Sequence, residues 1–417
     1  ELDRLTLGCV GVRRTTGQHP GGLVVVPDDM DVEDFTAVQH PADDPDSDTV
    51  TTHFEYHCME DNLLKLDMLG HDDPTMIRML EDLTGVNARA IPLDDPDTMS
   101  IFTSSKVLGF ENDEILGPTG AVAIPEFNTR FTRGMLMDTM PKDFNTLVRL
   151  SGFSHGTDVW LGNARDLIVG GTASVLETVG CRDDIMLYLI SMGLDPKMSF
   201  KIMEAVRKGK VKKGGFQEGW EEAMREHQVP DWYIGSLAKI GYLFPKAHAV
   251  AYVMMAFRIA WFKVHEPLAF YATFFSIRAK AFDAEYCCAG MDAVKQKIRE
   301  IENNKDATDV EQNLLVTLEV CYEFYLRGFH FDTISIYDSD ATHFKVTENG
   351  LLPPFVTVRG LGETAALDTV EKRQGKTFVS VEEFATTCNK LSKTHIEQLK
   401  ALGAFAGMAD TSQVALF

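Results

Sequence analysis

The sequence predicts an α+β fold that is mainly α-helical, and three observations support this class. Short segments near the N-terminus have the hydrophobic patterns of β-strands, the period becomes helical from about Asp73, and a glycine-bearing turn between helical segments follows Tyr337. A chain of 417 residues, 45% of them hydrophobic, is long enough for two or three domains that each have a core.

The predicted strands come first in the chain. Residues 22–26 form a short apolar run bounded by glycines and a proline, as expected of a buried strand, and residues 49–56 alternate in polarity. Residues 64–68 place three apolar side chains on one face and Lys65 and Asp67 on the other. We expect these three strands to form one small sheet with one buried face.

Helical spacing dominates the middle of the chain. The strongest signal is at residues 246–265, which are apolar on nearly all sides, as in a helix buried inside a larger assembly. His248, Arg258 and Lys263 lie within this stretch and argue against a membrane span. Further helices are predicted for residues 75–83, 183–192, 199–206, 294–302, 311–329 and 391–402.

The formal net charge of -22 argues against nucleic acid as a partner when it is considered alone, because that binding requires neutralised phosphates. The charge is uneven, however. Residues 28–61 contain twelve Asp or Glu and no Lys or Arg, whereas five of the seven residues 207–213 are basic. A local basic cluster can hold a polyanion because screening limits distant charges to a reach of about 8–10 Å. A solvated helix face is the alternative explanation of the basic run.

The seven cysteines form no C-x-x-C pair, and their number is odd. This usage fits a reducing cytoplasm and predicts neither a disulfide framework nor a zinc site in this segment. No segment resembles a signal peptide.

Lys65 and Asp67 are the first candidates for chemistry. Phosphoryl transfer requires carboxylates on a rigid element to hold two divalent ions, with a cation near the phosphates. A strand whose polar face is solvated is the alternative. Gly21 and Gly22 end a glycine-rich turn before the first strand, where backbone N–H groups can approach a phosphate closely.

Residues 151–160 combine small hydroxyls, a histidine and glycines, and we expect a ligand-positioning loop there. Ser154, His155 and Asp158 are too close in sequence for a hydrolase triad, and no nucleophile elbow surrounds them. His53 and His57 lie in a strand-like stretch. Residues four apart in a strand are about 13 Å apart, too far to share one metal ion.

Two C-terminal features suggest binding. Gly360 and Gly362 precede a predicted helix with the spacing of a helix-hairpin-helix, which binds a DNA phosphate without reading sequence, although a plain helix–helix turn has a similar pattern. The chain ends in residues 413–417, QVALF, which is typical of a short peptide that docks in a partner's pocket. A frayed end packed on its own domain is the alternative.

The order of several motifs identifies a family. RTTGQHPGG at residues 14–22, KLDMLGHDDPT at 65–75 and SGFSHGTDVWLGNA at 151–164 are followed by GCRDD at 180–184, VRKGK at 206–210 and FPKAHA at 244–249. This series closely resembles the α subunit of bacterial DNA polymerase III, PolC type, over essentially the whole chain.

The resemblance implies an architecture. Residues 1–75 would be the C-terminal part of a palm related to the polymerase-β nucleotidyltransferases, and residues 76–336 the α-helical fingers. Residues 337–409 would form a duplex-binding helix-hairpin-helix domain, and residues 410–417 a tail that binds the sliding clamp. Residues 211–219 have the character of an insertion after the basic run.

It also implies site residues. Asp67 matches the third of three palm aspartates that hold two Mg²⁺ ions, and Lys65 matches a palm lysine near the reacting phosphates. The first two aspartates would lie upstream of Glu1, so this fragment alone is expected not to polymerise. The expected nucleotide-binding residues are Arg182, Arg207, Lys208, Lys246, His248, Ser154, His155, Gly21 and Gly22. The expected duplex-binding residues are Gly360, Gly362 and Lys210, and the clamp-binding residues are Gln413, Leu416 and Phe417.

The function that follows is template-directed DNA synthesis in the cytoplasm, with primer–template DNA, dNTP, the clamp and other replisome subunits as partners and no membrane. The first alternative is a non-catalytic module that binds DNA and the clamp. A metallo-hydrolase that uses His53 or His57 is a more distant one.

Overall fold

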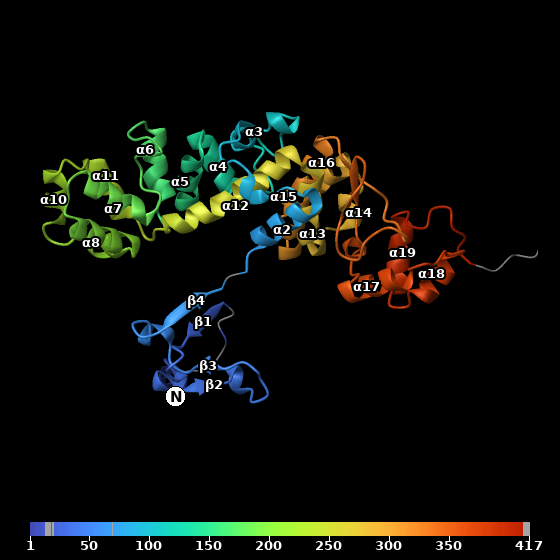
Figure 1. Cartoon of the computed structure of the whole chain (residues 1–417), viewed down its shortest axis with the longest axis horizontal. Helices are drawn as coiled ribbons and strands as arrows, with labels where there is room; N and C mark the ends of the chain where they lie inside the picture. The colour runs from blue at the N-terminus through green and yellow to red at the C-terminus, as the bar shows by residue number, and fades with distance from the viewer. Residues whose placement is uncertain (13–17, 19–20, 69, 412–417) are drawn as a thin grey trace, which may run out of the picture. The chain divides into compact units, whose positions relative to one another are not determined.

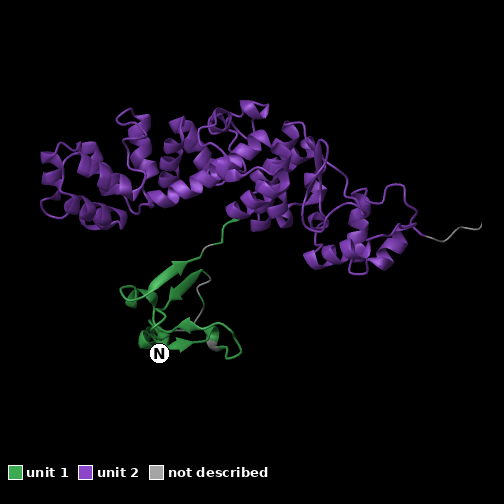
Figure 2. Ribbon diagram, viewed as in Figure 1, with its two compact units in different colours: residues 1–72 green, residues 73–417 purple. Residues whose placement is uncertain are grey.

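The computed structural model describes residues 1–12, 18, 21–68 and 70–411 of the chain. The chain divides into two compact units, Glu1–Asp72 and Asp73–Phe417 (Figure 1, Figure 2). The first unit carries short strands and turns, and the second is mostly helical. The predicted α+β class with a majority of helix is therefore confirmed.

The unit Glu1–Asp72 contains two separate two-stranded ribbons among its described residues. Strands β1 and β4 pair antiparallel, as do β2 and β3. The strands predicted at residues 22–26 and 64–68 are confirmed as β1 and β4, but the prediction of a single sheet was wrong. The elements of this unit are α1 (Leu2–Cys9), β1 (Gly22–Val25), β2 (Val38–Gln39), β3 (Thr51–Thr52) and β4 (Leu64–Asp67).

The strand predicted for residues 49–56 is also mostly wrong. Only Thr51–Thr52 pairs as a strand, and a 3-10 turn, Tyr56–Cys58, occupies the end of the segment. Side chains satisfy the backbone locally instead of a ladder: Ser47 Oγ accepts from Thr49 N at 3.2 Å, and the Thr52 hydroxyl donates to the Phe54 carbonyl at 3.2 Å. Such local bonds compete with strand pairing.

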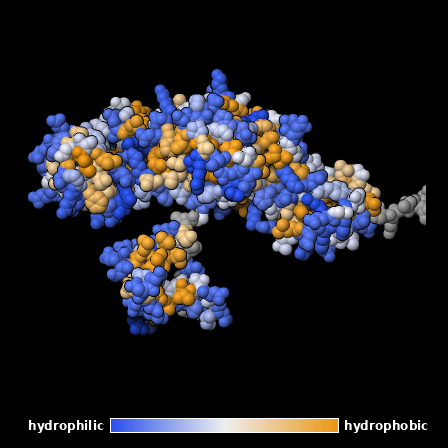
Figure 3. Space-filling model, in the orientation of Figure 1, coloured by the Kyte–Doolittle hydropathy of each residue, from blue (hydrophilic) through white to orange (hydrophobic). Residues whose placement is uncertain are grey.

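The apolar face of the β1–β4 ribbon is exposed, which contradicts the expected buried face. Leu23 is 54% exposed, Leu64 62% and Leu66 44%. The buried apolar side chains of the described part of this unit are Met59 and Leu63. Figure 3 shows apolar residues on the surface of this unit. The ribbon consists of two strands, and a two-stranded ribbon alone buries little of its apolar face.

The unit Asp73–Phe417 is built from helices, and every helix predicted from periodicity is confirmed. Its first helix, α2 (Asp72–Thr84), begins at the unit boundary. The others are α3 (Pro96–Ser100), α4 (Arg130–Thr139), α5 (Phe144–His155), α6 (Arg165–Val169), α7 (Arg182–Ser191), α8 (Pro196–Arg207), α9 (Lys210–Gly214), α10 (Trp220–Glu226), α11 (Asp231–Lys239), α12 (Lys246–His265), α13 (Pro267–Ile277), α14 (Ala284–Cys287), α15 (Met291–Asn303), α16 (Asp309–Leu326), α17 (Glu363–Lys372), α18 (Val381–Thr387) and α19 (Lys393–Ala401).

A three-stranded sheet precedes the last three helices. Its strands are β5 (His330–Phe331), β6 (Lys345–Val346) and β7 (Gly350–Leu352), in the order β5-β7-β6. Strand β7 pairs parallel with β5 and antiparallel with β6. One continuous hydrophobic core extends from Met76 in α2 to Phe405 beyond α19, so the sheet and the helices around it form a single packed body.

Helix α12 is the central helix of that body, with α3, α5, α7 and α13 packed against it. It is the one helix in the described ranges long and apolar enough to cross a membrane by length and composition. Ala256, Phe257, Ile259 and Ala260 on it are fully buried in the hydrophobic core, which is how the core helix of a folded domain packs.

Lys263 lies in this core with no exposed surface, yet all its donors are used. Its Nζ donates to the carbonyls of Gly120 (2.8 Å) and Val122 (2.6 Å) and lies 2.7 Å from a carboxylate oxygen of Glu323. The Tyr271 hydroxyl donates to the same carboxylate at 2.6 Å. A buried charge is tolerated only when it is paired and hydrogen-bonded in this way.

Candidate nucleotide-binding site

Lys65 and Asp67 share one face of the β1–β4 ribbon. The Lys65 Nζ lies 3.1 Å from the Asp67 Oδ1 and 5.1 Å from the centre of the Tyr56 ring. The Asp67 side chain is 60% exposed, so its second carboxylate oxygen remains open to a ligand. Strand pairing sets Gly22 opposite Asp67, and the Gly21 carbonyl accepts from Met68 N at 2.6 Å. The register therefore brings both glycines of the predicted phosphate turn beside the Lys65–Asp67 pair.

In the helical unit, the segment Gly241–Pro245 joins four elements that carry predicted site residues. The Tyr242 carbonyl accepts from Thr157 N, just past α5, at 3.0 Å. Leu243 N donates to the carbonyl of Arg207 at the end of α8 (3.3 Å), and the Phe244 carbonyl accepts from Arg182 N at the start of α7 (3.0 Å). Helix α12 begins directly after Pro245. We call this segment the hub.

Aromatic contacts extend from the hub along α12. The His155 ring stacks on Phe244 with centroids 4.7 Å apart, Phe244 meets His248 edge-on at 5.0 Å, and His248 lies 4.5 Å from Tyr252. His155 Nε2 is also 2.7 Å from Glu126 Oε2. That hydrogen bond raises the pKa of His155 above its ordinary value.

The prediction of a loop at residues 151–160 was wrong in its first half. Helix α5 extends to His155, with Asp143 as its N-cap: the Asp143 Oδ1 accepts from Thr146 N at 2.8 Å. The Ser154 hydroxyl donates to the Ser151 carbonyl within the helix at 2.9 Å. The segment was misjudged because its small polar residues obscured an apolar stripe through Leu150 and Phe153.

Two of the predicted basic side chains share one carboxylate. Arg207 donates from both Nε and Nη2 to Glu204, with Nη2 2.9 Å from Oε2, and Lys208 Nζ is 3.3 Å from the same Oε2. The Glu204 side chain is 24% exposed. The bond from Arg207, followed by that from Lys208, lowers the pKa of Glu204 against the opposing effect of burial, and Arg207 in turn has a raised pKa.

Lys246 and Arg182 contact two aspartates at the start of α7, Asp183 and Asp184. Lys246 Nζ is 3.0 Å from Asp184 Oδ1, and Asp183 accepts from Lys246 N at 2.8 Å. Asp184 also accepts from two backbone N–H groups, of Gly180 and Cys181, and so caps α7. Arg182 Nε lies 3.9 Å from Asp183, a loose contact that leaves the guanidinium partly exposed.

The predicted hairpin forms around Gly360 and Gly362. Gly360 has a φ of +78°, a conformation that side chains disfavour, and Leu361 N donates to the Val358 carbonyl at 3.0 Å. Gly362 is the N-cap of α17, and its carbonyl accepts from two backbone N–H groups of the first turn of that helix. The exposed start of α17 therefore offers N–H groups of the kind that bind a phosphate.

Comparison with known proteins finds family matches in three parts of the chain. Residues 1–70 match the bacterial DNA polymerase III alpha NTPase domain, residues 73–228 its finger domain and residues 328–414 a helix-hairpin-helix motif. Across the whole chain, identity is 55% to DNA polymerase III PolC-type of Caldanaerobacter subterraneus subsp. tengcongensis, 52% to that of Halalkalibacterium halodurans and 51% to that of Streptococcus mutans. The chain belongs to the PolC-type DNA polymerase III family. It spans about 30% of the length of these relatives.

Three acidic residues of this PolC-type chain were missed by sequence reasoning. Glu204 was detectable, because it precedes Arg207 and Lys208 by three and four residues in a predicted helix. Asp184 lies inside a quoted motif but carried no predicted role. Glu126 was out of reach, because it meets His155 from 29 residues away and sits in a backbone turn with a φ of +67°.

The remaining predicted residues are Lys210 and three residues of the C-terminal tail. Lys210 begins α9 and has no ion pair within the described ranges, whereas Lys212 pairs with Asp158 at 2.6 Å. Residues 211–219, predicted as insertion-like, contribute most of α9 and lie inside the matched finger domain. Gln413, Leu416 and Phe417 lie outside the described residues.

The histidines weighed as metal ligands have other partners. His53 Nδ1 is 2.7 Å from the Gln39 side-chain oxygen, and His57 pairs with Glu55. Among the residues that the structure describes, no group of three His, Cys, Asp or Glu could hold a metal ion. The structure therefore offers no support for the metallo-hydrolase interpretation.

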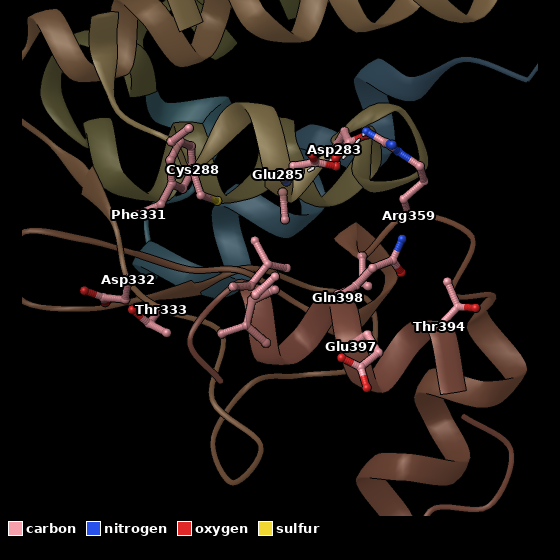
Figure 4. Close-up of a pocket in the computed structure, with 16 residues that line it drawn as sticks. Asp283, Glu285, Cys288, Phe331, Asp332, Thr333, Arg359, Thr394, Glu397 and Gln398 are labelled. Carbon is pink, nitrogen blue, oxygen red and sulfur yellow. Dashed lines mark hydrogen bonds and ion pairs between the residues drawn. The ribbon is translucent and has the colours of Figure 1, made fainter. Parts of the chain in front are cut away.

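A separate cavity of about 570 Å³ lies between α14 and α19, away from the hub (Figure 4). On its wall, Arg359 pairs with Asp283 at 2.7 Å and Glu285 at 3.0 Å. The Gln398 side-chain oxygen is buried without a partner among the described atoms. Because Arg359 immediately precedes Gly360, its ion pairs with Asp283 and Glu285 attach the hairpin to α14.

Proposed function

We propose that this chain supplies the end of the palm, the fingers and the duplex-binding domain of a replicative DNA polymerase that transfers a dNMP to a primer 3′-hydroxyl. The domains would be residues 1–75, 76–336 and 337–409, with a clamp-binding tail at 410–417. The supporting observation is that the hub forms backbone hydrogen bonds with Arg182 in α7 and Arg207 in α8 and directly precedes Lys246 in α12. Arg182 and Arg207 lie inside the finger-domain match, and the hub lies beyond its last residue. Residues of one triphosphate-binding surface have to converge in this way although they are far apart in sequence.

In the palm, Asp67 would contribute one ligand to the metal pair. Its exposed carboxylate on a paired strand suits that role. The remaining ligands would come from residues beyond those described, because no group of three His, Cys, Asp or Glu among the described residues could hold a metal ion. Divalent ions such as Mg²⁺, when bound there, lower the pKa of the primer hydroxyl and stabilise the charge that develops on the phosphate. Lys65, held beside Asp67, would orient that carboxylate and attract the triphosphate.

In the fingers, the triphosphate would be neutralised by Arg182, Arg207, Lys208 and Lys246. Because these cations are already held in position, they would stabilise the charge of the transition state better than water molecules, which have to reorient. His155 and His248 would line the same surface together with Phe244, on which His155 stacks. Ser154, Gly21 and Gly22 would also contact the nucleotide. The acidic side chains that hold the basic ones keep them ordered before nucleotide arrives.

Outside the nucleotide site, the hairpin at Gly360 and Gly362, with Lys210, would hold product DNA through phosphates without reading sequence. The tail residues Gln413, Leu416 and Phe417 would bind the sliding clamp and so raise the local concentration of polymerase at the primer end. The other replisome subunits are further proposed partners, and we infer a cytoplasmic location.

The decisive test is Asp67→Asn in the polymerase that joins this chain to the upstream region of its relatives. We expect single-turnover dNTP incorporation to fall by about 10³-fold or more, close to 4 kcal/mol of transition-state stabilisation, because the asparagine amide carries no charge for the metal. Primer–template affinity should be unchanged. Asp61→Asn, an exposed carboxylate off the ribbon face, is the matched control.

Retention of incorporation by Asp67→Asn would make Asp67 an ordinary strand residue and withdraw the assignment. A non-catalytic DNA- and clamp-binding module is the second candidate. It predicts DNA binding with no incorporation even when the upstream region is present.

A further inference from the structure

Glu204 is an acidic side chain that pairs with the side chains of two predicted triphosphate ligands, Arg207 and Lys208. It lies one turn before the end of α8 and accepts from two nitrogens of Arg207 and from Lys208. The carbonyl of Arg207 meanwhile accepts from Leu243 N of the hub. Glu204 is thus coupled to the hub through both the side chain and the backbone of Arg207.

The geometry separates Glu204 from an ordinary helix-surface ion pair. Arg207 presents one edge of its guanidinium, Nε and Nη2, to the carboxylate, and no hydrogen bond is formed by its Nη1 within the described ranges. A two-point contact fixes the plane of the guanidinium, so the free edge has a set direction. The Lys208 side chain is 49% exposed, and its Nζ lies 3.3 Å from Oε2 of the same carboxylate.

A charge count makes the same point. The Glu204 carboxylate and the two cations, Arg207 and Lys208, together carry a net charge of +1, so the three side chains still attract a polyphosphate. Without Glu204, the two cations would repel each other and their long side chains would sample many rotamers, which have to be ordered when nucleotide binds.

We propose that Glu204 is a positioning residue that orients Arg207 and Lys208 for the triphosphate of the incoming nucleotide. This inference rests on the proposed function, because it requires that Arg207 binds the nucleotide. Glu204 itself touches neither substrate nor metal, and its effect passes through the two basic side chains.

The test is Glu204→Gln in the complete polymerase, compared with Glu221→Gln. Glu221 pairs with Arg225 on α10 at 3.1 Å with helical spacing, but it is not attached to the hub. We expect Glu204→Gln to raise the dNTP KM by about tenfold with kcat changed less than about twofold, because ordering of the guanidinium then occurs at binding. The inhibition constant of inorganic tripolyphosphate should rise in parallel. Glu221→Gln should change neither value.

Glu204→Asp is the conservative variant. Its shorter carboxylate keeps the charge, and we expect it to recover part of the KM. Tryptophan fluorescence and melting temperature check that each variant is folded. If Glu204→Gln does not fold, Glu204→Asp still tests the proposal, with an expected KM between those of the parent and of Arg207→Ala.

Arg207→Ala separates two hypotheses: that Arg207 binds the nucleotide, and that Glu204 positions Arg207. An unchanged dNTP KM in Arg207→Ala overturns the nucleotide-binding role of Arg207 and with it the proposal for Glu204. A raised KM in Arg207→Ala with an unchanged KM in Glu204→Gln overturns only the positioning role. A lowered KM in Glu204→Gln also overturns it, because Glu204 would then compete with the triphosphate for the cations.

Discussion

The two candidate sites of this chain rest on very different supports. Lys65 and Asp67 lie on a two-stranded ribbon whose apolar face, with Leu64 and Leu66, is open to solvent. Arg182, Arg207 and Lys246 lie on helices α7, α8 and α12, which share one continuous hydrophobic core. A hydrophobic stripe in a sequence thus indicates which face can be buried, but burial requires a partner surface, and among the described residues the larger continuous core is that of the helical unit.

The difference bears on how each site is held. On the ribbon, the backbone ladder places Lys65 and Asp67 on one face, and the Tyr56 ring is the further contact of the Lys65 ammonium that the structure describes. Around the hub, core packing and acidic partners act together on the basic side chains. Catalytic groups need precise support, so the ribbon is the part of this chain that depends most on additional packing.

The largest expected effect comes from breaking the buried network of the helical unit. Lys263→Met should lower the free energy of unfolding by about 3–5 kcal/mol, because it leaves the Glu323 carboxylate buried without its cation. Urea unfolding followed by tryptophan fluorescence measures this unit selectively, since all four tryptophans lie within residues 73–417.

Lys213→Met is the control for that prediction. Lys213 is exposed on α9, and its replacement should change the free energy of unfolding by less than about 0.5 kcal/mol. Adding Glu323→Gln to Lys263→Met should restore part of the loss, because it removes the unpaired charge. Equal stability of Lys263→Met and the parent would mean that the network does not exist in solution.

A matched pair of leucines tests the comparison directly. Leu189→Ala in α7, at a fully buried position, should cost about 2–5 kcal/mol, whereas Leu66→Ala, at a position 44% exposed, should cost less than about 1 kcal/mol. Hydrogen exchange of peptides that cover α7 and β4, compared between each variant and the parent, measures the loss of protection in both elements. A loss of β4 protection as large as that of α7 would show that the ribbon face is covered in solution, and the comparison would fail.

Periodicity predicted the elements better than it predicted their packing. The strands around Asp67 and the helices α7, α8, α12, α15, α16 and α19 follow from spacing alone, because local pattern decides them. The single sheet failed because polar side chains around Ser47 and Thr52 satisfy the backbone locally. Sheet formation depends on long-range pairing, which a single strand pattern does not specify.

The same limit applies to the candidate site. A period of two placed Lys65 and Asp67 on one face, and the structure confirms that geometry. Spacing could not predict that Arg182, Arg207 and Lys246 meet at the hub. The three helices are far apart in sequence, and long-range backbone hydrogen bonds bring them together. Their selection came from the family resemblance, and their nucleotide-binding roles stay predictions.

The smallest expected effect concerns the pH dependence of the hub. The hydrogen bond that His155 donates to the Glu126 carboxylate raises the pKa of His155 above its ordinary value near 6.5. A folded pKa above the unfolded one means that the pair stabilises the fold fully below about pH 6.5, and that this contribution is lost as pH rises through the folded pKa. Because the His155 side chain is 41% exposed, the contribution should stay below about 1 kcal/mol.

Glu126→Gln isolates this contribution. The stability difference between the parent and Glu126→Gln should be largest at acidic pH and shrink through neutral pH, and an NMR titration should show the pKa of His155 falling toward its ordinary value in the variant. A pKa of His155 that is the same in both proteins would mean that Glu126 does not pair with it in solution. The hub would then be positioned by aromatic stacking and backbone bonds, and the contrast with the ribbon would rest on core packing alone.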